Sequence, residues 1–275
     1  MSRSKIFLLL TTASLYSISY AAESDVATNN VAENQAFQDF DNQYYIGYGL
    51  GYGNTKNGYG QRATYSTNSV GFGVEKLFDM GVWLAFDGVM VSDYINHSDN
   101  PNAQANPVGQ DPMLAALDVK VGYAFPMLKD TLLLTPYGTF GRNTNISSTS
   151  LKDNMTPDGG GTNTITVNST KDYFLASGVG GRLEYRVDSV FDFYFDQNFV
   201  YNIDMSNPNA QYAPMSNISL NSTLGAKFNV WRELQLGAQT FYSYSALTHT
   251  LSNSQQYDLV PENTVGGMIT VGLTY

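Results

Sequence analysis

The sequence predicts an all-β protein, a transmembrane up-and-down antiparallel β-barrel of about ten strands. Three observations support this fold. From residue 41 onward, apolar and polar side chains alternate with a period of two, as they do on strands with two unlike faces. Short and long connections alternate along the same region. After the first 21 residues, no segment approaches the roughly 20 apolar residues of a membrane-spanning helix.

Residues 1–21 have the layout of a secretory signal peptide. Arg3 and Lys5 form a short basic region, an apolar stretch begins at Ile6, and Ser19-Tyr20-Ala21 offers a small-x-small cleavage site. The alternative is a buried N-terminal strand. We expect export and cleavage after Ala21.

The composition excludes several kinds of site. The chain contains no cysteine, which rules out disulfides and thiolate metal sites. Its formal net charge is −10, and losing Arg3 and Lys5 with the signal takes it to −12. Such an acidic chain is a poor partner for nucleic-acid phosphates, which need clustered lysine and arginine. The 20 tyrosines, against 15 phenylalanines and 2 tryptophans, favour interfaces over a dry core.

Residues 22–40 read as a polar N-terminal segment in the periplasm, mostly disordered. One short helix can form there, because Asn30 and Glu33 have capping-box spacing beside apolar Val31 and Phe37. We hypothesise that the stretch from Val31 to Phe40 occupies the periplasmic mouth of the barrel.

The barrel itself is expected over residues 41–275. Its clearest strand is the last, where Val265, Gly267, Ile269, Val271, Leu273 and Tyr275 share one face and threonines and glycines occupy the other. The expected strands are 44–53, 69–77, 82–91, 115–125, 132–141, 175–187, 191–201, 218–230, 234–244 and 264–275. The sequence does not decide which side chains of 132–141 point into the lumen.

The expected connections fall into two classes. Short turns lie near 79–81, 127–130, 188–189 and 231; longer polar loops cover 54–63, 95–111, 144–171, 203–216 and 247–262. Outer-membrane barrels have short periplasmic turns, longer external loops and an even strand count. Ten strands therefore place both termini in the periplasm, and 8 or 12 strands fit less well. The main alternative, a soluble β-sandwich, would not alternate its turn lengths in this way.

Two segments resemble a known family. The opening Tyr44-Tyr45-Ile46-Gly47-Tyr48-Gly49-Leu50-Gly51-Tyr52-Gly53 and the close Gly266-Gly267-Met268-Ile269-Thr270-Val271-Gly272-Leu273-Thr274-Tyr275 are similar to small Gram-negative outer-membrane β-barrels of the OmpA-barrel and opacity-protein type. The resemblance covers about 41–275. It implies a cell outer-membrane location, contact with outer-membrane lipid and lipopolysaccharide, and a final strand that the barrel-assembly machinery reads through Val271, Leu273 and Tyr275.

This chain departs from that family in two respects. It ends in tyrosine where phenylalanine is more usual. We also expect it to lack the C-terminal peptidoglycan-binding domain of the OmpA type, so cell-wall anchoring does not carry over.

Charged residues recur at the strand positions that alternation assigns to the inward, lumen-facing side. They are Glu75, Asp87, Asp118, Lys120, Arg182, Glu184, Arg186, Asp192, Asp196, Lys227 and Glu233. Buried charges must pair or be hydrated. They therefore form either cross-strand salt bridges that brace the barrel or an acidic conduit that favours cations. Because about eight strands leave an interior just filled by side chains, ten predict a closed or very narrow pore.

The leading functional interpretation is a non-enzymatic surface barrel that contacts a host, phage or neighbouring-cell receptor through its loops. A narrow porin-like channel for small solutes or cations is the alternative. A third candidate is a protease of the omptin kind, which needs Asp-His and Asp-Asp pairs at the rim. His97 and His249 are the two histidines, and neither lies in an Asp-x-His arrangement. We expect no catalytic, metal or cofactor site.

Overall fold

A computed structural model describes residues 26–56, 62–98, 113–128, 131–145, 149–152, 166–169, 172–204, 216–248 and 260–275. The expected signal peptide lies outside these residues. The helix is α2 (Val26–Asp41). The strands are β1 (Gln43–Lys56), β2 (Arg62–Leu77), β3 (Val82–Ser98), β4 (Met113–Tyr123), β5 (Phe125–Met127), β6 (Leu132–Asn145), β7 (Thr149–Lys152), β8 (Thr166–Ser169), β9 (Asp172–Arg186), β10 (Phe191–Asp204), β11 (Ser216–Trp231), β12 (Leu234–Thr248) and β13 (Val260–Thr274).

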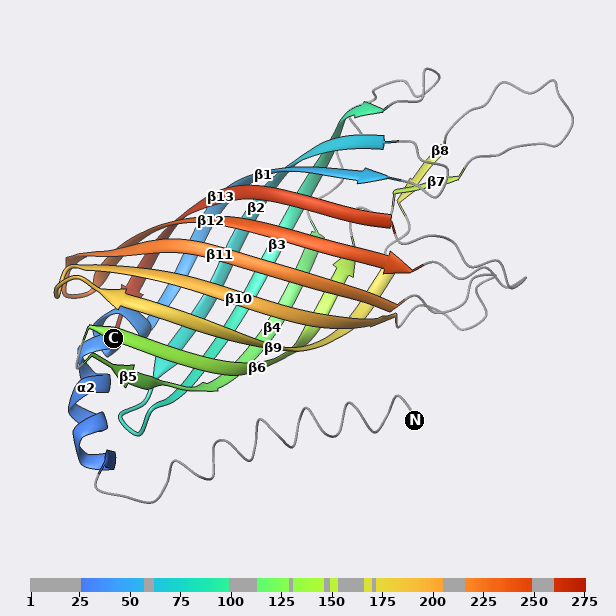
Figure 1. The fold of residues 1–275 in the computed structure, drawn as a ribbon. Coiled ribbons are helices and arrows are strands. Elements are labelled where there is room, and N and C mark those ends of the chain that lie inside the picture. The colour runs from blue at the N-terminus through green and yellow to red at the C-terminus, as the bar shows by residue number, and fades with distance from the viewer. Residues whose placement is uncertain are drawn as a thin grey trace, which may run out of the picture.

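The strands close into a barrel of ten (Figure 1). Neighbours follow one another in sequence and pair antiparallel, β1 pairs with β13, and β4 pairs with β6. β4 and β5 are two parts of one barrel strand, interrupted at Ala124, and both pair with β6. A separate hairpin, β7 with β8, lies between β6 and β9 in the chain. The predicted up-and-down barrel is confirmed.

Side-chain exposure alternates along the strands as the sequence predicts. On β1, Tyr44, Ile46 and Tyr48 are each more than half exposed, whereas Gly47 and Gly49 are buried. Every barrel strand exposes at least one large apolar side chain, and most expose several. Hydrocarbon offers backbone amides no water, so a spanning sheet must close on itself and turn apolar residues outward.

The structure decides the parity of β6, which the sequence left open. Leu133, Thr135 and Tyr137 are buried and point into the lumen, while Leu134 and Phe140 are exposed on the outer surface. Inward Tyr137 lies against Gly180 of the neighbouring β9, where an added methyl group would overlap the tyrosine ring. The absence of a side chain at that glycine therefore makes room for the ring.

The two ends of the barrel differ, and we call them the turn end and the loop end. Connections at the turn end span 78–81, 128–131, 187–190 and 232–233; those at the loop end span 57–61, 99–112, 146–171, 205–215 and 249–259. The predicted alternation of short and long connections is confirmed. Gly81 adopts φ +88° in the first short turn, a conformation that side chains disfavour. The C-terminal Tyr275 also lies at the turn end, where its amide donates to the carbonyl of Asn42 over 3.1 Å.

Helix α2 corrects the expectation that residues 22–40 are mostly disordered. It runs for 16 residues and lies against the turn end of the barrel (Figure 1). Phe37 and Phe40 are fully buried, and Phe37 belongs to the same buried cluster as Leu77, Trp83 and Leu133 of the barrel. Burying an aromatic side chain stabilises a segment that its own polar sequence would leave unfolded.

None of the described helical residues form a segment long and apolar enough to cross a membrane.

Candidate functional site

The candidate site is a buried charge network in the lumen at the turn end, where α2 meets the barrel wall. Arg182 of β9 lies at its centre. Its Nη1 donates to Oε1 of Glu75 on β2 over 3.0 Å, and its Nη2 lies 3.5 Å from Oδ1 of Asp41, the last residue of α2. Its Nε forms a close ion pair with Glu184, two residues further along β9. One guanidinium therefore joins two barrel strands and the helix.

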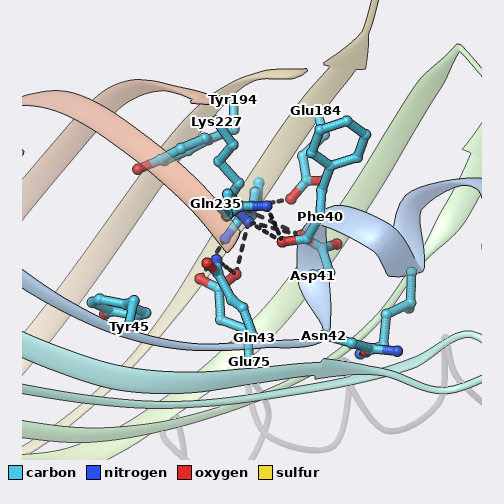
Figure 2. Close-up of polar contacts among 12 residues, drawn as sticks. Phe40, Asp41, Asn42, Gln43, Tyr45, Glu75, Glu184, Tyr194, Lys227 and Gln235 are labelled. Carbon is cyan, nitrogen blue, oxygen red and sulfur yellow. Dashed lines mark hydrogen bonds and ion pairs between the residues drawn. The ribbon is translucent and has the colours of Figure 1, made fainter. Parts of the chain in front are cut away.

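Lys227 of β11 makes the second set of contacts to the helix (Figure 2). Its Nζ donates to the carbonyl oxygen of Phe40 over 3.1 Å, to Oδ1 of Asp41 over 3.0 Å and to Oε2 of Glu75 over 2.9 Å. The last carbonyls of a helix lack partners within it and carry partial negative charge, so a cation there is favourable. Lys227 thus supplies a hydrogen-bond donor to a free carbonyl at the C-terminal end of α2 and pairs with the carboxylate of its last residue.

These ion pairs cross the lumen. The strands of Glu75 and Arg182, β2 and β9, are separated by β3, β4 and β6 in one direction around the barrel and by five strands in the other. A 3.0 Å contact between strands so far apart in the sheet spans the interior. The lumen is therefore filled by side chains at this level.

Aromatic rings and amides complete the surroundings of the network. The Tyr194 ring lies 4.5 Å from the guanidinium carbon of Arg182 and 5.6 Å from Nζ of Lys227, both within cation–π range. Gln43 donates to Oε2 of Glu75 over 3.1 Å, and Gln235 donates to the Phe40 carbonyl over 3.4 Å. Both amides are visible beside Glu75 and Phe40 in Figure 2. The charges are thus held by neutral donors and ring faces in place of water.

Acidic groups outnumber basic groups at this level. Glu184 and Asp192 are fully buried, and neither oxygen of Asp192 has a hydrogen-bond partner among the residues that the structure describes. Asp192 stands opposite Lys227 in the β10–β11 register and opposite Arg186 in the β10–β9 register. Asp41, Glu75 and Glu184 pair with the two cations Arg182 and Lys227. The ion-paired carboxylates therefore outnumber the cations that contact them at a level that is shielded from solvent.

A second polar layer lies nearer the loop end. Lys120 of β4 pairs with Asp87 of β3 at 2.9 Å and lies 3.9 Å from Asp196 of β10. Tyr45 donates to Asp87 over 2.5 Å, and Tyr137 donates to Asp196 in a close contact. The side chains of Lys120, Asp87 and Asp196 are 18%, 19% and 12% exposed, against 0–9% for the ion-paired groups of the layer at α2. This second layer is the more hydrated of the two.

The structure brings together most of the charges that the sequence placed in the lumen. Glu75, Arg182, Glu184, Asp192 and Lys227 lie in the layer at α2, and Asp87, Asp118, Lys120 and Asp196 lie in or beside the second layer. Arg186 is half-buried at the turn end, where its Nε donates to the carbonyl of Asp188 over 3.1 Å.

The expected inward orientation of Glu233 was wrong. This residue is exposed in the two-residue turn between β11 and β12. Strand parity no longer applies to it, because β11 ends at Trp231 and the ladder with β12 shifts register between Asn229 and Trp231.

The most important residue that the sequence analysis did not assign to the network is Asp41. It was placed at the boundary between a disordered segment and the barrel. Asn34, Phe37 and Asp41 recur at helical spacing and are all buried. That spacing is the signal that could have identified one buried face of a helix ending in a carboxylate. The inward tyrosines Tyr137 and Tyr194 were likewise not assigned to the site.

Other predicted residues lie away from this network. Val271, Leu273 and Tyr275 are exposed on the outer surface near the turn end. The Tyr275 ring lies 4.7 Å from that of Tyr44 and 4.7 Å from Nζ of Lys76. His249 and the side chain of His97 lie outside the described part of the chain.

The described residues contain no group of three or more histidine, cysteine, aspartate or glutamate side chains arranged to hold a metal ion.

A closed ten-stranded antiparallel barrel with an apolar outer surface and a polar, charged lumen has one solvent environment that suits it, a lipid bilayer. The protein has the fold of the small Gram-negative outer-membrane β-barrels. No protein-family model matches the chain, and no curated protein sequence matches it.

Solved structures of similar shape are outer-membrane proteins. The outer membrane protease OmpT of Escherichia coli is 10% identical, with 86% of this chain and 97% of that one covered and a TM-score of 0.37. The β domain of the Bordetella autotransporter BrkA is 9% identical, with 86% and 100% covered and a TM-score of 0.40. The translocator domain of the autotransporter NalP from Neisseria meningitidis is 11% identical, with 94% and 98% covered and a TM-score of 0.35. These proteins differ in function, and at these identities the likeness concerns the fold alone.

Proposed function

We propose that this protein is a closed, non-enzymatic outer-membrane barrel that holds its long loops at the cell surface for recognition or adhesion. The observation that carries this proposal is the cross-lumen pair of Glu75 and Arg182, which is capped by α2 through Asp41. A barrel filled in this way cannot pass a solute while the helix is docked. The feature left to carry a function is the set of connections at the loop end, four of which are at least 11 residues long.

The proposed orientation places the loop end outside the cell and both the C-terminus and α2 in the periplasm. Binding residues are commonly carried by loops on a rigid scaffold. The longest connection, 146–171, contains the hairpin of β7 and β8, so its outer part, 153–165, begins from paired strands. It is the natural segment to exchange in a test.

The adhesion test compares bacteria that display the intact protein with bacteria in which a four-residue Gly-Ser turn replaces residues 153–165. Barrel folding is checked by heat-modifiable gel migration, and binding is counted on cultured epithelial cells. We expect the exchange to remove most binding while the barrel stays folded. Equal binding by both strains would contradict loop-mediated adhesion. Replacing 100–111, a segment of comparable length in another connection, with the same four-residue turn controls for shortening any loop.

The closed state is tested separately in planar bilayers at neutral pH, where we expect the full chain to show no stable conductance. Large, steady currents would contradict the proposal. The protease alternative is tested with a peptide library, on which we expect no cleavage by the purified barrel. Cleavage that disappears in His97→Ala would replace the present proposal with an enzymatic one.

A narrow cation channel is the second candidate function. It is favoured by the partial exposure of Lys120, Asp87 and Asp196, which indicates that water reaches the second layer. Both candidates agree on the barrel and differ in whether the layer at α2 ever opens.

A further inference from the structure

We propose that α2 is a releasable plug, latched by Asp41, and that its release opens a cation-selective passage through the barrel. The inference rests on the proposed closed barrel and adds its regulation. It assigns Asp41 the role of a latch between the plug and two lumen cations.

The helix can leave without breaking the barrel. Its link to β1 is the single residue Asn42, and none of the barrel's strand ladders includes α2. Asn42 is held at the wall, since its side-chain oxygen accepts from the amide of Leu77 over 2.8 Å and its carbonyl accepts from the amide of Tyr275 over 3.1 Å. This arrangement leaves Asn42 as a fixed pivot and α2 as the moving part.

The attachment of the plug is concentrated at its C-terminal end. The carboxylate of Asp41 is fully buried, and its Oδ1 lies 3.0 Å from Nζ of Lys227 and 3.5 Å from Nη2 of Arg182. Further back, Asn34 donates to the carbonyl of Asp79 over 3.3 Å and Gln38 to its carboxylate over 2.7 Å, the latter bond in an exposed position. Exposed hydrogen bonds contribute little, so the buried ion pairs and the buried rings of Phe37 and Phe40 dominate docking.

Departure of α2 would also weaken the cross-lumen pair beneath it. Glu75 and Arg182 attract strongly because α2 and the surrounding side chains keep water away from them. An ion pair that becomes hydrated contributes little and opens easily. A passage past Arg182 then needs only side-chain motion, because no backbone segment other than α2 caps this level among the described residues.

The walls of that passage favour cations. At the α2 level, Glu75, Glu184 and Asp192 are balanced by Arg182, Lys227 and Arg186 when Asp41 leaves, so the excess of carboxylates lies deeper in the barrel. At the second layer, Asp87, Asp118 and Asp196 stand against Lys120. Rings of excess carboxylate select cations in narrow pores.

Release of the helix depends on the charge that Asp41 meets inside the lumen. Lys227 of β11 and Arg182 of β9 both contact its carboxylate, and both cations also pair with Glu75 of β2. Reversing the charge at position 41 would therefore bring like charges together in a buried site, which favours undocking of the helix.

The first experiment compares the full chain with Asp41→Lys in planar bilayers. A lysine there meets Arg182 and Lys227 and should undock the helix, raising the open probability by roughly a hundredfold. Asp39→Lys is the matched control, since it makes the same charge change at an exposed position on the same helix. We expect Asp39→Lys to stay closed, and Asp41→Asn to be intermediate. Reversal potentials in a KCl gradient should show cation selectivity in the open variants.

The second experiment follows the plug directly, using the absence of cysteine in the chain. At a fixed pH of 7, Phe37→Cys should react slowly with a water-soluble maleimide, and the Asp41→Lys background should make it react fast. Gln35→Cys, exposed on the same helix, should react fast in both backgrounds and corrects for the intrinsic reactivity of the thiol.

The outcomes separate this inference from the proposed function. If Phe37→Cys stays protected from the maleimide in the Asp41→Lys background, Asp41 does not act as the latch. If the cysteine is labelled fast but no current is seen, release of the helix does not open a passage. If the current is selective for anions, the walls of the passage do not carry the excess of carboxylates proposed here. Steady current through the unmodified chain while Phe37→Cys stays protected would instead contradict the proposed closed barrel.

Discussion

Glu75 and Arg182 lie 107 positions apart in the sequence and on opposite sides of the lumen, yet their side chains meet at 3.0 Å. The side chains are 9% and 4% exposed, so the pair is shielded from solvent. Removing one member of a buried pair leaves the other charge without compensation, which costs far more than the pair itself contributes.

Arg182→Met should therefore destabilise the barrel severely, by about 3–5 kcal/mol. The loss arises because Glu75, Glu184 and Asp41 all depend on this guanidinium. Urea unfolding in lipid vesicles, followed by tryptophan fluorescence, measures the free energy. Arg232→Met, in the exposed turn after β11, is the control and should change it by less than about 0.5 kcal/mol. Adding Glu184→Met to Arg182→Met should recover part of the loss, and a further drop would contradict this account.

Gly225→Ala should destabilise the barrel by about 1–3 kcal/mol through overpacking. An added methyl group at this lumen position would overlap the ring of Tyr194, which lies beside Arg182 and Lys227. Gly181→Ala is a matched control, because a methyl group there would have no neighbour within 4 Å. The same unfolding measurement applies. Equal effects of the two substitutions would show that the backbone, and not the ring contact, governs these positions.

Ile269→Arg should cost about 2–4 kcal/mol, the range for a cation on the lipid face near the bilayer midplane. Ile269 is 69% exposed on β13, midway along an outward row that runs from Val265 to Leu273. Met80→Arg has the same exposure, 69%, but lies in a turn at the barrel end and should be nearly neutral. The free energy of unfolding in lipid vesicles distinguishes the two substitutions. A neutral Ile269→Arg would argue that this face is not in contact with hydrocarbon.

Tyr275→Ala should lower the yield of folded barrel in the outer membrane, whereas Tyr275→Phe should keep it. The ring packs on Tyr44 and beneath Lys76, and phenylalanine preserves both contacts while losing the hydroxyl bond to the Glu75 carbonyl. Heat-modifiable migration of the membrane fraction reports the yield. Tyr242→Ala, an aromatic change on the outer face of β12 toward the loop end, is the control. If both alanine variants assemble equally well, the terminal residue carries no special signal.

Strand number, strand faces and the alternation of turns and loops follow from the sequence, because a period of two records which side of a closed sheet meets lipid. The inward positions of Glu75 and Arg182 follow from that same parity, whereas Glu233 escaped it because the ladder shifts register before the turn. Parity states which way a side chain points, and it carries no information on which strand lies opposite.

Tertiary structure alone decided the partners across the lumen and the place of α2. The polar sequence of 22–40 has little reason to fold in isolation, and its helix is stabilised by burying Phe37 and Phe40 in a mouth that exists only after the barrel has closed. Asp41 gained its role in the same way, since Arg182 and Lys227 are far from it in sequence and meet it only through closure. Local pattern therefore determines the wall of this protein, and long-range packing determines what fills it.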